Sequence, residues 1–286
     1  MRVVMVGATG RHAHWVLDEL NRQGVEVRAL VRDEQRAEVA LSNGAADTVI
    51  ADLTQPESLP DAVAGVDAVF HIGPAHVEGE TNMGLAMVAA ARAAGVRKFV
   101  YSGVIHPSIA NLWNHAAKLP VEEALYSSEL DFTVLQPARF MQDYDPFWDD
   151  VMTRDRLRQP YSPVSKMCWV DYRDVAEVAA KAVAGNQLGY GTFELCAPGM
   201  LDTREAAAIA SDVLGRAISA EQIPLDEFAS QFRHGLNQDS MAHMMTHYDQ
   251  VGLPGGNSLV LRSILGREPR SLRDYFGELA TRWSPG

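Results

Sequence analysis

The sequence predicts an α/β protein, with a doubly wound parallel sheet in its first half and a smaller C-terminal α+β lobe. Two observations predict this class. Short apolar runs alternate with helical patterns from the N-terminus to about Phe140. The runs are apolar at successive positions, as in Val3–Val6, which indicates strands that helices bury on both faces. The ligand site of such a fold is expected at the carboxyl ends of the strands.

The first half contains six expected strands, separated by helical patterns. The strands are expected at Val3–Val6, Val25–Val31, Ala46–Ile50, Ala68–Ile72, Lys98–Ser102 and Phe132–Leu135. The helices are expected at His14–Gln23, Arg36–Leu41, Pro56–Val63, Asn82–Ala94 and His115–Tyr126. Gly24 and Gly95 directly follow two of these helices, where glycine is common because it adopts left-handed backbone angles.

The regular alternation stops after about Phe140. Asp143–Pro163 is rich in Asp, Pro and aromatic residues, so a loop with a short helix is expected there. A strand is expected at Thr192–Leu195, and helices at Val175–Val183, Arg204–Leu214, Glu227–Tyr248 and Leu272–Trp283. No low-complexity linker separates the two halves. We therefore expect residues 1–140 to form the sheet domain and residues 141–286 to form a smaller lobe packed over its rim.

Composition narrows the class of protein. Of the 286 residues, 47% are hydrophobic and 22% are charged, as in an ordinary globular protein. The formal net charge of -12 argues against a nucleic-acid partner, because no basic surplus exists to displace counterions. No apolar run approaches the roughly 18 residues needed to span a bilayer, so no membrane contact is expected. The chain opens on a strand pattern and has only two cysteines, so a cytoplasmic location is expected.

Gly7 and Gly10 stand between the first expected strand and the first expected helix. Glycine is needed at such a turn because the chain bends sharply and its backbone must approach a pyrophosphate closely. The amide groups at the helix N-terminus would then face the phosphates. A third glycine is usual at the position of Ala13, and alanine is its smallest substitute. The turn predicts a dinucleotide site, with a purely structural turn as the alternative.

The second expected strand runs into Arg32. Folds of this kind that select NAD place Asp or Glu about 20 residues beyond the glycines, where the carboxylate binds the ribose 2′-hydroxyl. A guanidinium instead binds a 2′-phosphate through charge-assisted hydrogen bonds. The sequence therefore favours NADP(H) over NAD(H). The adjacent Asp33 opposes this preference, and a solvated charge at the strand end is the alternative role of Arg32.

Several blocks of sequence, in a consistent order and spacing, resemble one known family. They are Val6-Gly7-Ala8-Thr9-Gly10, Ala29-Leu30-Val31-Arg32, Asp52-Leu53, Phe99-Val100-Tyr101-Ser102, Lys118 with Val121-Glu122-Glu123, Leu135-Gln136-Pro137-Ala138-Arg139-Phe140, and Val170-Asp171-Tyr172-Arg173-Asp174-Val175-Ala176. These blocks resemble the atypical short-chain dehydrogenase/reductases of the NmrA-like group. The resemblance implies a Rossmann-type sheet, with residues 1–140 binding NADP(H) and residues 141–286 binding substrate.

The resemblance also implies where NADP(H) would lie. The pyrophosphate turn would contain Gly7, Thr9, Gly10, Arg11 and His12. Arg32 would bind the 2′-phosphate, and the adenine and ribose would be lined by Asp52, Leu53, Ile72, Gly73 and Pro74. Lys118 would reach the nicotinamide ribose, and the nicotinamide would lie beside Pro137, Ala138 and Phe140.

The sequence departs from the ordinary short-chain dehydrogenases at the proton donor. Those enzymes carry a tyrosine four residues before the lysine, and the lysine lowers the pKa of that tyrosine. Here the position is Asn114, which has no proton of useful acidity. The NmrA-like group often lacks this tyrosine. It contains quinone and dye reductases as well as proteins that bind the dinucleotide without known turnover.

Three residues are candidates for catalysis. Lys118 could hydrogen-bond the ribose and place positive potential near a reducible group, or could be an ordinary surface lysine. His115 could donate a proton near neutral pH, or could face away, since successive helix residues point about 100° apart. Ser102 could hydrogen-bond a substrate carbonyl, or could cap the following turn.

Aromatic side chains after the sixth strand are the candidate substrate contacts, because stacked rings suit a flat acceptor. They are Tyr144, Phe147 and Trp148, and the alternative is that they pack the lobe onto the sheet. His243 and His247 stand at i and i+4 of an expected helix. No Glu lies between them and no third ligand is apparent, so no metal is expected.

Two functions follow from these observations. The first is an NADPH-dependent oxidoreductase that transfers hydride to a small quinone, carbonyl or conjugated aromatic acceptor without a tyrosine proton donor. The second is an NADP(H)-binding redox sensor that relays its state to a protein partner without turnover. Asn114 favours the second, and the aromatic loop favours the first. The expected ligand is a small aromatic or carbonyl substrate, and the sequence does not choose between a monomer and a homodimer.

Overall fold

The computed structural model describes residues 1–232 and 236–284. The chain divides into two compact units. Unit 1 contains Met1–Gln136 and Val175–Glu194, and unit 2 contains Pro137–Asp174 and Leu195–Gly286. The segment 175–194 thus belongs to unit 1, although the expected boundary at residue 140 assigns it to the second lobe. Every helix among the described residues is too short or too polar to cross a membrane.

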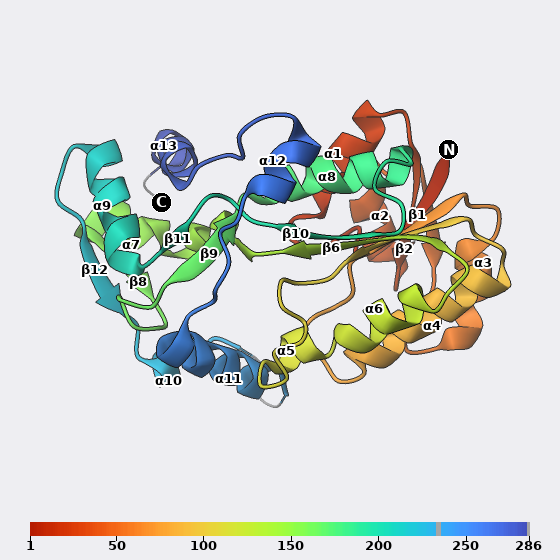
Figure 1. Ribbon diagram of the computed structural model, residues 1–286, viewed down its shortest axis with the longest axis horizontal. Coiled ribbons are helices and arrows are strands. Elements are labelled where there is room, and N and C mark those ends of the chain that lie inside the picture. The colour runs from red at the N-terminus through yellow and green to blue at the C-terminus, as the bar shows by residue number, and fades with distance from the viewer. Residues whose placement is uncertain (233–235, 285–286) are drawn as a thin grey trace. The chain divides into compact units, whose positions relative to one another are not determined.

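Unit 1 is built on a seven-stranded sheet (Figure 1). Its strands are β1 (Arg2–Val6), β2 (Glu26–Val31), β3 (Asp47–Ile50), β4 (Ala68–His71), β5 (Lys98–Ser102), β6 (Asp131–Pro137) and β10 (Gly191–Leu195). They lie in the order β10-β6-β5-β4-β1-β2-β3, and β1 to β6 pair in parallel. The strand order reverses between β1 and β4, which confirms the predicted doubly wound, Rossmann-type fold.

Helices cover both faces of this sheet. On one face lie α1 (Ala13–Arg22) and α8 (Tyr172–Ala184), and on the other lie α3 (Leu59–Val63), α4 (Glu80–Ala93) and α6 (Leu119–Tyr126) (Figure 1). The remaining helices of this unit are α2 (Glu34–Ser42), η1 (Pro56–Ser58) and α5 (Trp113–Ala116). The expected single helix at His115–Tyr126 is therefore two helices, α5 and α6. The break between them precedes Pro120, which lacks the N–H that a continuous helix would need there.

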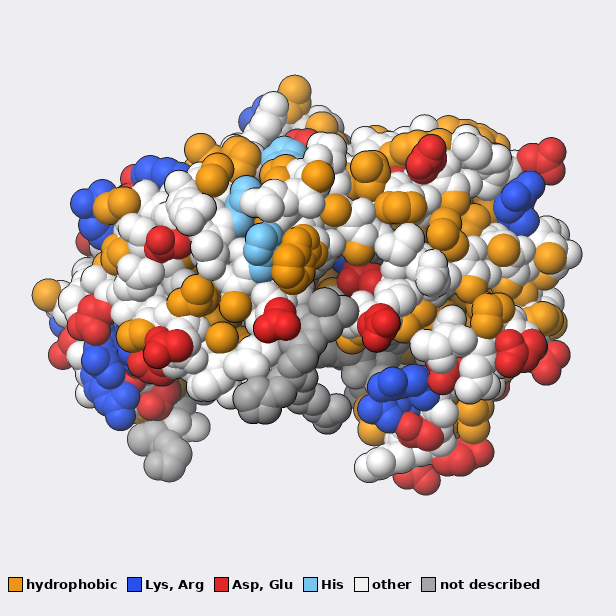
Figure 2. Space-filling view, turned by 90° about the horizontal axis from the view of Figure 1, so that it is seen from below, with side chains coloured by type: hydrophobic (Ala, Val, Ile, Leu, Met, Phe, Trp, Pro, Cys, Tyr) orange, Lys and Arg blue, Asp and Glu red, His pale blue; other side chains and the backbone are white. Residues whose placement is uncertain are grey.

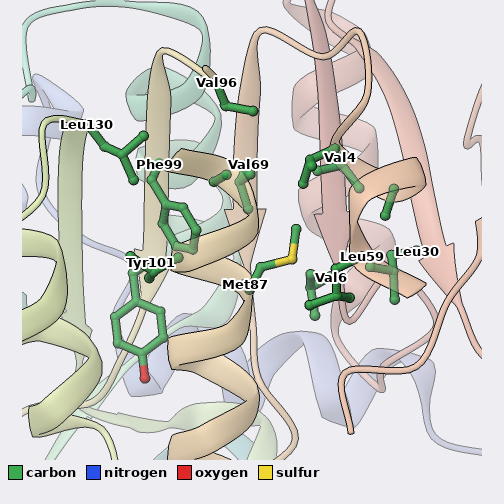
Figure 3. Packing of buried hydrophobic residues seen from close by; sticks show 14 of the residues in the cluster. Val4, Val6, Leu30, Leu59, Val69, Met87, Val96, Phe99, Tyr101 and Leu130 are labelled. Atoms are coloured by element: carbon green, nitrogen blue, oxygen red, sulfur yellow. The ribbon is translucent and has the colours of Figure 1, made fainter. Parts of the chain in front are cut away.

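The apolar core of unit 1 lies between the sheet and α3, α4 and α6 (Figure 3). Val4, Val69 and Phe99 come from three neighbouring strands and lie in one buried cluster with Met87 of α4. Burying each of these side chains contributes about 1.5–3 kcal/mol. Tyr101 joins the cluster near the carboxyl end of β5, and its hydroxyl points away from the other side chains (Figure 3). The core thus fixes the carboxyl ends of the strands against the helices.

Unit 2 combines helices with short strands, which confirms its predicted α+β character. β11 (Met200–Leu201), β9 (Met167–Val170) and β7 (Arg139–Phe140) form one sheet, and β12 (Ser219–Gln222) pairs in parallel with β8 (Arg156–Gln159). Its helices are η2 (Met141–Phe147), α7 (Trp148–Arg154), α9 (Thr203–Leu214), α10 (Leu225–Ala229), α11 (Leu236–Val251), α12 (Leu259–Leu265) and α13 (Leu272–Arg282).

Two expectations for this half are wrong. The segment 143–163 is not mainly a loop, because it contains most of η2, all of α7 and β8. The expected helix at 227–248 is divided into α10 and α11, and residues 233–235 of that prediction lie outside the described residues.

Candidate functional site

The turn after β1 requires glycine at position 7. Gly7 has a φ of 84°, and a Cβ there would lie 2.7 Å from the carbonyl oxygen of Ile72. Gly10 closes the turn by donating its N–H to the carbonyl oxygen of Gly7 at 2.8 Å. α1 then begins at Ala13 without a capping hydrogen bond from the His12 side chain. The close backbone approach and the helix start without a side-chain cap are what a pyrophosphate site requires.

Arg32 lies exposed directly beyond β2. Within residues 1–232 and 236–284, its guanidinium makes no hydrogen bond or ion pair. The adjacent Asp33 accepts the N–H of Arg36 at 2.8 Å as the N-cap of α2 and also pairs with the Arg36 guanidinium. The hydrogen bond from the Arg36 N–H lowers the pKa of Asp33. The carboxylate that opposed NADP(H) in the sequence is therefore engaged by α2, and Arg32 stays open to a phosphate.

Asp52 follows β3 and is half-buried. It accepts hydrogen bonds from the N–H of Thr54 at 2.9 Å and from the Thr54 hydroxyl at 2.8 Å, and these lower its pKa. Leu53 packs against the core of unit 1. Of the other predicted cofactor residues in this unit, Thr9, His12, Ile72 and Gly73 are half-buried, and Arg11 and Pro74 are exposed.

Lys118 connects α5 to α6 and is held by Glu80 of α4. Its ammonium pairs with the Glu80 carboxylate and donates to the carbonyl oxygen of Asn114 at 3.0 Å. The exposed fractions of the two side chains are only 12% and 8%. Lys118 is therefore not an ordinary surface lysine, and its ammonium is fixed at the start of α6.

His115 and Ser102 lie in unit 1 and are both buried. Nδ1 of His115 lies 2.7 Å from the carbonyl oxygen of Ile105, so this ring nitrogen is the donor. Burial lowers the pKa of His115 to about 4. At neutral pH the imidazole is therefore uncharged and its one N–H is committed to Ile105, which gives no support to His115 as a proton donor. Ser102 is the last residue of β5, beside Leu135 of β6.

Sequence reasoning missed a buried carboxyl near Lys118. Glu122, one helical turn after Lys118, is 1% exposed. Gln136 donates to both of its oxygens, at 3.1 and 2.8 Å, and the Tyr126 hydroxyl donates to one of them at 3.2 Å. Burial raises the pKa of Glu122. The sequence offers little signal for this residue, because the exposed Glu123 beside it is the same amino acid.

The predicted contacts from the second half lie in unit 2 and are mostly core residues. Tyr144 stacks on Trp169 with ring centroids 4.6 Å apart, and Trp148 lies 4.9 Å from the ring of Phe276. Tyr144 and Trp148 are 1% and 3% exposed, so they present no open face to a substrate ring. They pack the interior of unit 2, which corrects the expectation of a substrate sandwich. Phe147 is half-buried.

The residues predicted beside the nicotinamide end β6 or follow it. Pro137 is the last residue of β6 and is buried, as is Ala138. Phe140 is half-buried and packs edge-on against Tyr172 at 4.8 Å.

The charged surface is mixed. On the face seen in Figure 2, Lys and Arg side chains lie in separate small groups among acidic and apolar ones. Within the part of the chain that the structure describes, no group of three or more His, Cys, Asp or Glu side chains could hold a metal ion.

Comparison with known families decides the relationship. A sequence profile of the NmrA-like family matches residues 1–276. The chain belongs to the NmrA-like family. This confirms the resemblance carried by the glycine turn and the later sequence blocks.

Relatives match this NmrA-like chain over almost its whole length. It is 29% identical over 282 residues to an NAD(P)H azoreductase of Xenophilus azovorans, covering 96% of each chain. Its fold is similar to that of the NADPH-dependent quinone oxidoreductase QOR2 of Escherichia coli, solved in complex with NADPH. That similarity has a TM-score of 0.82 at 20% identity and covers 97% of this chain and 99% of QOR2. Triphenylmethane reductase of Citrobacter sp. gives a TM-score of 0.84 at 19% identity, covering 98% and 100%.

Proposed function

We propose that this protein is an NADPH-dependent oxidoreductase that reduces a small quinone, carbonyl or conjugated aromatic acceptor. One observation carries the proposal: the glycine turn at Gly7 and the open guanidinium of Arg32 follow neighbouring strands of one sheet. The names of the relatives support it, since an azoreductase, a quinone oxidoreductase and a triphenylmethane reductase are all reductases.

The residues present fit NADP(H). Gly7 has no Cβ, which allows a phosphate to approach the backbone closely. The N–H groups at the start of α1 receive no hydrogen bond from the His12 side chain and would donate to the phosphate. Arg32 would bind the 2′-phosphate, because Asp33 is occupied by Arg36. Lys118 would bind the nicotinamide ribose through an ammonium that Glu80 already orients. NADPH, when bound, would supply the hydride and thus both electrons of the reduction.

The chain's own residues would then act mainly by binding and orientation. Asn114 and the uncharged His115 provide no acid at the position where ordinary short-chain dehydrogenases have one. An acceptor whose reduced form is a weak base tolerates this, which favours quinones and conjugated dyes. The same two residues favour the second candidate, an NADP(H)-binding sensor without turnover.

The first experiment separates the two candidates. Purified protein is mixed with NADPH and a panel of quinones, azo and triphenylmethane dyes and enones, and the nicotinamide absorbance is followed. We expect NADPH oxidation with at least one acceptor. Tight NADPH binding without oxidation by any acceptor would replace the reductase with the sensor.

The second experiment tests the cofactor. Arg32→Ala should weaken NADPH binding by about tenfold to a hundredfold and leave NADH binding nearly unchanged, as expected for loss of charge-assisted hydrogen bonds. Arg22→Ala is the control, because it also removes one guanidinium from unit 1. Arg22 is the last residue of α1 and pairs with Glu19, away from the glycine turn at the start of that helix. An equal loss for both cofactors would show that Arg32 does not bind the 2′-phosphate.

A further inference from the structure

A chain of hydrogen bonds runs from the surface of unit 1 to the buried carboxyl of Glu122. Thr192 is exposed on β10, and its hydroxyl lies 3.0 Å from the hydroxyl of Tyr126. The Tyr126 hydroxyl donates to Oε2 of Glu122 at 3.2 Å. Because Tyr126 uses its proton toward Glu122, the Thr192 hydroxyl is the donor to Tyr126. The donors therefore point inward, from solvent to Glu122.

The hydrogen-bond partners of this carboxyl are neutral. Its hydrogen-bond donors, Gln136 and Tyr126, carry no charge. The charge of Lys118, one turn earlier, lowers the pKa of Glu122, but its ammonium is paired with Glu80 of α4 and burial has the larger effect. Tyr101 faces the carboxyl from β5, and burial together with Glu80 and Glu122 raises the pKa of Tyr101, so this neighbour is also neutral. A buried carboxyl with neutral partners favours its protonated form, and burial accordingly raises the pKa of Glu122.

The contacts of the two carboxyl oxygens locate the acid proton. Oε2 accepts from Gln136 at 2.8 Å and from Tyr126 at 3.2 Å, whereas Oε1 has only the longer Gln136 contact of 3.1 Å. In the protonated carboxyl, the oxygen with more donors acts as the carbonyl oxygen, which assigns the acid proton to Oε1. Oε1 faces Gly103, where a Cβ would lie only 3.0 Å away.

Gly103 directly follows the last residue of β5 and is half-buried. A Cβ at position 103 would also lie 3.4 Å from Cε1 of Tyr101 and 3.5 Å from the carbonyl oxygen of Leu135, so glycine keeps the space beside Oε1 open at the carboxyl end of β5. Ligands of doubly wound sheets bind at the carboxyl ends of the strands.

We propose that Glu122 is the proton store of the reduction, reloaded from solvent through Thr192 and Tyr126 and discharged past Gly103. The proposal rests on the reductase function proposed above. It provides the proton that Asn114 cannot supply.

The proton balance is closed by water. The acceptor gains a hydride and one proton. The proton leaves the Oε1–H bond of Glu122 and a carboxylate remains. Tyr126 gives its hydroxyl proton to Oε2 while it takes one from Thr192, and Thr192 takes one from water. The carboxyl is then protonated again, on Oε2, and a half-turn about the Cγ–Cδ bond returns this proton to the Gly103 side. One solvent proton has been consumed, and no further oxidant or reductant is needed.

Infrared spectroscopy of the protein without cofactor tests the store directly. The wild type should show the carbonyl stretch of a protonated carboxylic acid at neutral pH, and the band should be missing in Glu122→Gln. Gln136→Arg should also remove it, because a guanidinium beside the carboxyl favours the carboxylate. Tyr126→Phe should retain it. A wild-type spectrum identical to that of Glu122→Gln in this region overturns the proposal.

Rapid-mixing kinetics test the path. In Tyr126→Phe, the first turnover of NADPH oxidation should match the wild type, because the store is loaded, and later turnovers should slow by about tenfold or more. Glu122→Gln should slow the first turnover as well. Tyr190→Phe is the matched control, since Tyr190 is an exposed tyrosine of the same unit, and it should change neither phase.

The outcomes separate this proposal from the reductase function. Wild-type rates in both Glu122→Gln and Tyr126→Phe, at every pH, would overturn the proton store and leave the reductase in place with water as the proton source. No NADPH oxidation by the wild type with any acceptor would overturn both. Unfolding curves and NADPH binding will show whether Glu122→Gln folds. If it does not, Tyr126→Phe still tests the path, because Tyr126 is half-exposed and its hydroxyl can be removed without disturbing the core.

Discussion

The ammonium of Lys98 lies 3.1 Å from the carbonyl oxygen of Ala182, at the C-terminal end of α8. It also donates to the carbonyl oxygens of Val183 and Gly185 and to the side chain of Asn186. Lys98 begins β5 and is 1% exposed. The last carbonyl groups of a helix lack partners within the helix, and a cation is favourable there. The first residue of a strand thus caps a helix that is distant in sequence.

Replacing this lysine should destabilise unit 1. Lys98→Met keeps an unbranched side chain but leaves buried carbonyl groups without a donor, which costs about 1–3 kcal/mol. Denaturant unfolding followed by circular dichroism measures the loss. Arg97→Met is the control, because Arg97 is the adjacent cation and is exposed. Equal stabilities for the two variants would contradict the capping role.

Gly7 and Gly24 differ in why the position requires glycine: left-handed backbone at both, and a close contact with another backbone segment at Gly7 alone. Both have positive φ values, of 84° and 69°, but a Cβ at Gly24 would meet nothing within 4 Å. Gly24→Ala should therefore lose only about 1–2 kcal/mol for left-handed backbone. Gly7→Ala should lose more, because its Cβ would also clash with the Ile72 carbonyl oxygen at 2.7 Å, and it should weaken NADPH binding. Unfolding and cofactor titration measure both effects, and equal losses would remove the argument for close approach.

Acid should weaken the fold through buried histidines. Burial lowers the pKa of His71, of His76 and of His115 from 6.5 to about 4. Between these values the unfolded chain binds more protons than the folded one. Their contribution to stability is therefore complete above about pH 6.5 and falls as pH falls toward about 4.

His71→Leu tests this pH dependence. His71 is 1% exposed, and its Nδ1 has no hydrogen-bond partner among the described residues, so the variant should be at least as stable at neutral pH. The slope of unfolding free energy against pH should fall by about one proton within the window. His14→Leu, an exposed position on α1, is the matched loss of an imidazole. An unchanged slope in His71→Leu would show that His71 titrates normally.

Asp174 should stabilise unit 2. Its buried carboxylate accepts from the Arg267 guanidinium and from the Arg270 backbone N–H, both at 2.8 Å, and pairs with the Arg270 guanidinium. Asp174→Asn should cost about 1.5–3 kcal/mol, the range for hydrogen bonds to charged groups. Asp212→Asn is the control, because the Asp212–Arg273 pair is more than half exposed and contributes about 0–1 kcal/mol. Similar losses in the two variants would count against the buried pair.

The sheet of unit 1 was predictable because each of its first six strands can be recognised from a short stretch of consecutive residues. All of β1 to β6 except β3 are short runs with buried apolar residues. The glycine turn and Arg32 are found by their distance along the chain from such a run. The strands β7 and β11 have two residues each, and both pair with β9, about 30 residues away in sequence. No local pattern marks strands whose only partners are distant.

The buried part of the site was not predictable for a related reason. Glu122 and Glu123 are adjacent and identical in type, and the rotation of α6 against β6 decides which one Gln136 contacts. Tyr144 and Trp148 show the same limit, since an aromatic residue suits a substrate and a core equally well. Their burial against Trp169 and Phe276 appears only once unit 2 is assembled.

The chain passes between the two units three times, after Gln136, Asp174 and Glu194. No single cut of the polypeptide can therefore release either unit whole. A gene fragment that ended near residue 140 would encode a sheet without β10 and without the helix end that Lys98 caps. Unit 1 is thus not a portable module, although most of it, Met1–Gln136, is continuous in sequence. Truncated or shuffled variants of this protein therefore have to keep the segments of both units together.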